Sequence, residues 1–180
     1  MIPIIRKSTD YPFDRLESLL SGFKYVLFDT HTNDKTLSLS NEENTITWKG
    51  MIDGFETDVF LQDFKYAVDP FKTLEDEPLE NFCEYLNNHY NIIDGKTLTI
   101  ELYYTPFCPH CGHMISLIDK TAFALPGKFN ITNINLRDFN RPEIDAVPTF
   151  YMNGKKYVGS MPPNIFYDLL RELLWSSVSK

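Results

Sequence analysis

The sequence lacks the features of a membrane protein and of a nucleic-acid-binding protein. No uninterrupted apolar run approaches the ~18 residues that span a bilayer. The start, Met1-Ile-Pro-Ile-Ile-Arg-Lys, meets proline and charge too early for a secretory signal. Acidic residues outnumber basic ones, with 25 Asp and Glu against 17 Lys and Arg. The resulting net charge of -8 repels a phosphate backbone. We therefore expect a cytoplasmic protein that binds neither membranes nor nucleic acid.

Cysteine is also scarce. The 180 residues include only Cys83, Cys108 and Cys111, an odd number that does not describe a secreted disulfide framework. A chain of this length, 43% hydrophobic, buries roughly 70% of its unfolded surface, so it needs neither a metal nor a disulfide to fold. Two of the three cysteines stand three residues apart, and this pair is the most informative feature of the sequence.

The second half of the chain shows alternating strand and helix patterns. Asn153-Gly154 between two short β-prone runs is a strong hairpin signal. Thr105-Pro106 ends an apolar strand, and apolar residues recur at helical spacing after Pro109 until Leu125-Pro126-Gly127. The predicted elements are a strand at 97–104, a helix from 109, a strand at 131–136, a hairpin of 149–152 and 155–158, and a helix at 163–175.

The first half gives weaker signals. We predict a helix at 14–20, a strand at 24–30, a hairpin within 36–48, a strand at 59–68 and a helix at 78–89. No chemical motif occurs in the first 50 or so residues. We accordingly divide the chain into an N-terminal region, 1–54, and an α/β domain, 55–180.

Cys108-Pro109-His110-Cys111 stands where a predicted strand leads into a predicted helix. The first sulfur then lies beside unpaired amide groups at the positive end of the helix dipole, which stabilises a thiolate. The second sulfur lies one turn later on nearly the same face, close enough to attack a mixed disulfide on the first. We predict Cys108 as the nucleophile and Cys111 as the resolving thiol. His110 adds positive charge or a hydrogen-bond donor near Cys108, and Pro109 suits the first helical turn.

A zinc half-site is the alternative interpretation of this motif. His110 or His113 and a distant fourth ligand would have to complete the coordination. No second C-x-x-C exists, and His31 and His89 lie far away in the sequence, so we predict no metal site.

The run Ile100 to Cys111, followed by Ala146-Val-Pro-Thr149, Met152-Asn-Gly154 and Tyr157-Val-Gly159, resembles the thioredoxin superfamily. It is most similar to small archaeal glutaredoxin-like thioredoxins and to the C-terminal unit of archaeal protein disulfide oxidoreductases. The resemblance implies an α/β thioredoxin-like fold, with a central mixed sheet flanked by helices. The N-terminal region, which has no C-x-x-C, is then an extension or a degenerate second unit.

The resemblance also implies roles for individual residues. Pro148 would be a cis-proline that packs against the disulfide, so that Val147 offers its backbone to a substrate chain. Phe107 is a candidate for the apolar rim on which a peptide rests, although aromatics beside a strand also serve as core. Glu101 is a candidate for the buried acid that some thioredoxins use as proton acceptor for the resolving cysteine, with a solvated strand edge as the alternative.

These implications lead to a functional hypothesis. We expect thiol-disulfide exchange on protein disulfides or dithiols, with no metal or organic cofactor, with a thioredoxin reductase as a candidate electron donor, and with a couple more oxidising than that of thioredoxin. A glutathione-dependent glutaredoxin is one alternative, but Gly159-Ser-Met-Pro162 lacks the acidic residues that hold glutathione in that family. The other alternative is a non-catalytic binding module whose C-x-x-C is a structural disulfide or a metal clip.

Overall fold

One eight-stranded mixed sheet runs through the molecule in the order β2-β1-β3-β4-β6-β5-β7-β8. The structure is a computed structural model that describes residues 1–89, 95 and 97–176. Within those residues, none of the helices combines the length and apolar composition that crossing a bilayer requires. Its elements are β1 (Ile4–Lys7), α1 (Asp14–Leu19), β2 (Val26–Asp29), β3 (Thr36–Ser40), β4 (Thr45–Lys49), α2 (Glu56–Val68), the 3-10 helix η1 (Pro70–Glu75), α3 (Glu77–Asn88), β5 (Leu98–Tyr104), α5 (Pro109–Ala124), β6 (Phe129–Asn135), β7 (Thr149–Met152), β8 (Lys155–Val158) and α6 (Pro163–Ser176).

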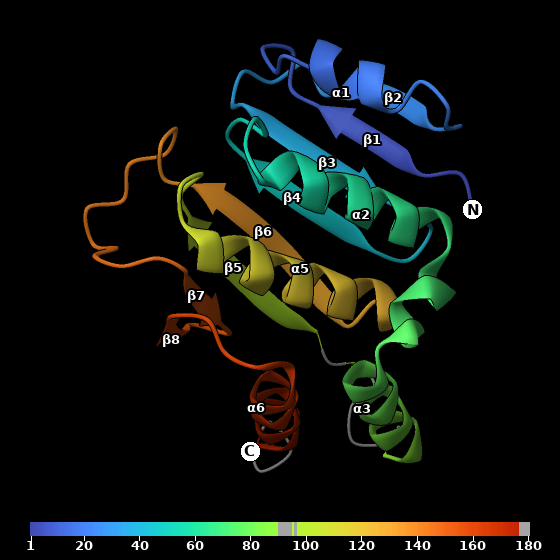
Figure 1. The fold of residues 1–180 in the computed structure, drawn as a ribbon, viewed down its shortest axis with the longest axis vertical. Helices are drawn as coiled ribbons and strands as arrows, with labels where there is room; N and C mark the ends of the chain where they lie inside the picture. The colour runs from blue at the N-terminus through green and yellow to red at the C-terminus, as the bar shows by residue number, and fades with distance from the viewer. Residues whose placement is uncertain (90–94, 96, 177–180) are drawn as a thin grey trace.

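The sheet is built from two repeats of one strand arrangement. β1 pairs parallel with β2 and antiparallel with β3, which forms a hairpin with β4. β5 likewise pairs parallel with β6 and antiparallel with β7, which forms a hairpin with β8. A helix follows each hairpin, α2 in the first repeat and α6 in the second. Parallel pairing of β4 with β6 joins the two repeats into one sheet (Figure 1).

The structure corrects one sequence prediction in this region. The predicted strand 59–68 is wrong, because these residues belong to α2 and bury Phe60, Phe64 and Ala67 at helical spacing. The boundary predicted at residue 54 therefore falls before the helix that completes the first repeat. The predicted α/β class with a central mixed sheet is confirmed.

α2 and α5 lie side by side across one face of the sheet (Figure 1). β5 turns Leu98, Ile100 and Leu102 to the buried side and leaves Thr99 exposed, as the two-residue period of a strand requires. The start of α5 approaches the start of α2 closely, because a Cβ at Gly112 would lie 2.9 Å from the ring of Phe55. This close approach brings the loop before α2 beside the first turn of α5.

Candidate functional site

Cys108 and Cys111 lie where β5 passes into α5. Cys108 caps the 16-residue helix with extended backbone, φ -91° and ψ 109°, and Pro109 takes the first helical position, where a missing N–H loses no bond. The Cys111 N–H donates to the Cys108 carbonyl at 3.1 Å and closes the first turn. The Cys108 sulfur is therefore beside the unpaired amide groups at the positive end of the helix.

The two cysteines have different environments. Both are free thiols, but Cys111 is completely buried while Cys108 is only partly so. Burial raises the pKa of the Cys111 thiol well above its ordinary value, and its hydrogen bond to the Cys108 sulfur acts in the same direction. Among the described residues, no group of three or more His, Cys, Asp or Glu side chains is arranged to hold a metal ion. The arrangement provides one reachable sulfur and one protonated thiol behind it.

The loop before β7 forms the second wall of the site. The Cys108 thiol donates to the carbonyl of Val147 at 3.6 Å, across 39 positions of sequence. The Val147–Pro148 peptide bond is cis and Pro148 is buried. The N–H of Gly159 donates to the Pro148 carbonyl at 2.8 Å, and the Thr149 hydroxyl donates to the Ala146 carbonyl at 2.7 Å, so the loop is held on both sides.

A buried carboxyl group from the first repeat lies close to the thiols. Glu56 is completely buried at the start of α2. Its Oε2 accepts the Gly54 N–H at 2.9 Å, and its Oε1 has no hydrogen-bond partner. Burial raises the pKa of Glu56, and the charge of Glu56 contributes to raising the pKa of Cys111. The contact between Phe55 and Gly112 holds the start of α2, which carries Glu56, against the first turn of α5.

Asp63 and Asp119 form a buried carboxyl pair between α2 and α5. Desolvation raises the pKa of Asp63 well above its ordinary value, and the neighbouring Asp119 acts in the same direction. Desolvation also raises the pKa of Asp119, to about 7, although hydrogen bonds from Asp63 and from the Asn133 amide at 2.8 Å oppose this. The pair therefore holds a proton to higher pH than two carboxyl groups in water would.

Sequence reasoning missed Asp63 because it interpreted residues 59–68 as a strand, and it missed Glu56 because it predicted no helix that begins there. A helical signal was nevertheless present, since Glu56, Phe60, Asp63 and Ala67 follow the spacing of one helix face. Two acids on an apolar helix face are expected to be buried, and the structure buries both.

The other predicted site residues lie at the surface or away from the thiols. The Phe107 side chain is 87% exposed beside Cys108, and those of Pro109 and His110 lie on the first turn of α5. Glu101 is exposed on the opposite face of β5 from the buried Leu102, where it accepts a hydrogen bond from the Tyr103 hydroxyl at 3.1 Å. Of the two interpretations of Glu101, the structure fits the solvated strand edge and not the proton acceptor, because strand alternation turns its carboxylate away from α5.

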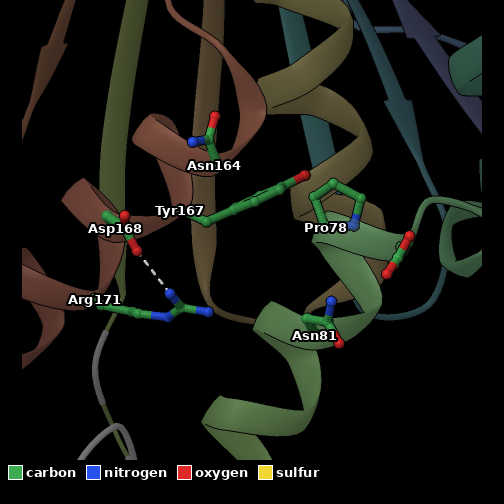
Figure 2. A pocket seen from close by; sticks show the side chains of 7 residues that line it. Pro78, Asn81, Asn164, Tyr167, Asp168 and Arg171 are labelled. Atoms are coloured by element: carbon green, nitrogen blue, oxygen red, sulfur yellow. Dashed lines mark hydrogen bonds and ion pairs between the residues drawn. The ribbon is translucent and has the colours of Figure 1, made fainter.

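A separate pocket of about 370 Å³ lies between α3 and α6 (Figure 2). Figure 2 shows Asn164 and Tyr167 of α6 opposite Pro78 and Asn81 of α3. The Arg171 guanidinium donates to Asp168 at 2.7 Å and also lies over the rings of Phe82 and Tyr85. No cysteine lines this pocket, and its arginine is already paired within the protein, so we do not assign it to the thiol site.

Comparisons with known proteins find similarity at the level of structure. No protein-family model matches the sequence, and no curated protein does. A protein disulfide oxidoreductase from Aeropyrum pernix superposes with a TM-score of 0.68 at 15% identity, over 96% of this chain and 86% of its own. The alkylhydroperoxide reductase AhpF from Enterococcus faecalis gives a TM-score of 0.67 at 16% identity, over 94% of this chain and 90% of that chain.

The chain has a thioredoxin-like fold. The likeness extends over both repeats of the sheet, because the aligned part covers nearly the whole chain. The three cysteines all follow the first repeat in sequence, and the thioredoxin-like unit made of β5, α5, β6, β7, β8 and α6 holds the adjacent pair.

Proposed function

We propose that the protein is a thiol-disulfide oxidoreductase that acts on protein substrates through Cys108 and Cys111. The pairing of a reachable sulfur at a helix start with a buried thiol one turn later supports this most directly. Such a pair suits a reaction in which one sulfur attacks from outside and the other completes the exchange from within.

The reaction proceeds in two exchanges. The Cys108 thiolate attacks one sulfur of a substrate disulfide, so a mixed disulfide forms and the other substrate sulfur leaves as a thiolate. Cys111 then loses its proton and attacks the Cys108 sulfur, which releases the second substrate thiolate. The Cys108–Cys111 disulfide has formed, and the substrate has gained two electrons and, from solvent and the site, two protons. The reverse sequence oxidises a substrate dithiol.

Glu56 supplies the proton acceptor for the second exchange in this proposal. Cys111 is buried, so its proton needs a base inside the protein. The unpartnered Oε1 of Glu56 is such a base when ionised, and burial raises the pKa of Glu56 toward the range in which it takes up a proton.

Substrate recognition is assigned to the rim of the site. The exposed Phe107 ring offers an apolar contact beside Cys108, and the backbone at Val147–Pro148 offers strand-like pairing to an extended chain. His110 lies on the first turn of α5 next to Cys108. We include a cytoplasmic location and reduction by a thioredoxin reductase in the same proposal.

Reduction of insulin disulfides tests the assignment. We expect Cys108→Ser to abolish the activity and Cys111→Ser to accumulate mixed disulfides that resolve slowly on a non-reducing gel. Cys83→Ser is the matched control, because Cys83 is buried in α3 and has no part in the reaction. If Cys108→Ser keeps the activity, the assignment of Cys108 as the nucleophile fails. If the wild type itself shows no activity, the non-catalytic binding module takes the place of the proposal.

A further inference from the structure

Exposed apolar side chains gather at one end of the molecule. Seven of the twelve large hydrophobic residues exposed within the described residues fall in positions 1–28. Five of them lie on α1, on β2 and in the turn between these elements, and we call this surface the β2 edge: Leu19, Phe23, Val26, Leu27 and Phe28. Figure 1 shows α1 and β2 together at the end of the sheet. Apolar groups concentrated in this way mark an interaction surface.

The backbone of β2 is open on the same side. β2 is the terminal strand of the sheet and pairs only with β1. The N–H groups of Val26 and Thr30 donate to the carbonyls of Pro3 and Lys7, at 3.0 and 2.9 Å. Alternate residues of a strand point their N–H and C=O groups to opposite sides, so those of Leu27 face away from β1. These backbone groups of Leu27 are free to form hydrogen bonds with a further strand.

The opposite end of the sheet is protected in a way that β2 is not. β8 is the other terminal strand, and it carries exposed Lys155 and Lys156 within the strand itself. Lysines within an edge strand discourage pairing with another chain. All four residues of β2 are exposed. The first three are apolar, and the only charged side chain in the strand is that of Asp29 at its last position. The β8 edge therefore presents lysines to solvent, whereas the β2 edge presents mainly apolar side chains.

We propose that β2 pairs antiparallel with β2 of a second copy of the chain, around a two-fold axis at Leu27. In this register Val26 lies opposite the partner's Phe28 on one face, and Leu27 lies opposite the partner's Leu27 on the other. The two Leu27 residues exchange N–H and C=O bonds, with Cα atoms about 5.5 Å apart. Leu19 and Phe23, on and after α1, extend the apolar contact beyond the two paired β2 strands.

The self-complementary pattern of β2 is the reason to favour a second copy over another partner. Leu27 is flanked by Val26 and Phe28, so a two-fold axis at Leu27 places apolar groups opposite apolar groups on both faces. Pairing of β2 with β8 of another copy would instead place lysines against apolar side chains and would lead to an open fibre. The β2–β2 interface does not cover the thiols, because β5 lies five strand positions from β2, about 24 Å away.

Sedimentation equilibrium over a wide concentration range tests this proposal. The wild-type chain is expected to pass from one to two chains per particle as the concentration rises. Leu27→Lys places two like charges on the axis and is expected to stay monomeric, while Val158→Lys on the exposed β8 edge is the matched control and is expected to dimerise normally. Both positions are exposed, so both variants are expected to keep the wild-type circular dichroism spectrum and thiol activity.

A cross-link tests the register. With Leu27→Cys, mild oxidation is expected to give a disulfide between position 27 of both chains, identified by peptide mass spectrometry, because a ~5.5 Å separation of Cα atoms permits the bond. Val158→Cys is expected to give no such link. A wild-type chain that stays monomeric, a folded Leu27→Lys variant that still dimerises, or particles that grow without limit would each overturn the proposal.

Discussion

Replacing Asp63 with Asn tests whether the buried carboxyl pair holds a proton in the folded protein. Asp63 is buried beside Asp119, and its pKa is raised well above the ordinary 3.8. The folded chain is therefore expected to hold a proton on this pair over a pH range in which the unfolded chain has released it. Each such proton lowers the free energy of unfolding by ~1.4 kcal/mol for every unit by which pH rises.

The sign follows from the raised pKa. A carboxyl group that is protonated only in the folded state contributes stability at low pH and loses it as pH rises toward its raised pKa. Between pH 6 and pH 8, the free energy of unfolding of the wild type should fall more steeply than that of Asp63→Asn, by up to ~1.4 kcal/mol per pH unit, because an amide at position 63 can donate to Asp119 without taking up a proton. For a chain of this size, each kcal/mol of difference corresponds to about 2 to 4 °C in Tm.

Urea denaturation at several pH values measures this difference directly. Asp58→Asn is the matched control, because Asp58 lies on the same helix with its side chain exposed. It should follow the wild-type curve. Unfolding free energies of Asp63→Asn and wild type that fall in parallel between pH 6 and pH 8 would refute the reasoning, since the pair would then hold no extra proton.

Three further predictions concern the site. Glu56→Gln should slow decay of the mixed disulfide in single-turnover experiments by ~10²-fold while leaving its formation unchanged, because an amide accepts no proton; an equal slowing of both steps would contradict this role. Gly112→Ala should lower the free energy of unfolding by about 1 to 3 kcal/mol, since its methyl group would lie 2.9 Å from Phe55, and unchanged denaturation would show that the helices separate freely. The reduction potential of the Cys108–Cys111 couple, measured in thiol buffers by alkylation and mass shift, should lie near roughly -180 to -120 mV rather than near the roughly -270 mV of thioredoxin; the latter value would indicate a reductant.

The parts of the fold that could be predicted from sequence are those with local signals. Asn153-Gly154 favours a hairpin by its turn chemistry alone, and β7 and β8 flank it as expected. The strand, helix and thiol pair around Cys108 follow from neighbouring residues in the same way. The α2 segment was misassigned because a short apolar run fits a buried strand as well as a helix.

The composition of the site could not be predicted because its parts come from distant segments. Glu56 stands 55 positions before Cys111, and only the packing of α2 against α5 brings them near each other. Glu101 was a candidate because it lies in the strand that leads to the cysteines, but strand alternation places it on the outer face. A pattern in the sequence predicts which side an element buries, and it does not predict which elements meet.

The parallel pairing of β4 with β6 makes the two repeats dependent on each other. One half contributes the cysteine pair, while the other contributes a buried acid and half of the shared carboxyl pair. A cut between the halves would expose the apolar faces of α2 and α5 together with a central strand edge. The chain should accordingly unfold in one cooperative step, and limited proteolysis should not release an active C-terminal fragment. A half that carries no cysteine pair is in this way a structural part of the proposed reaction centre.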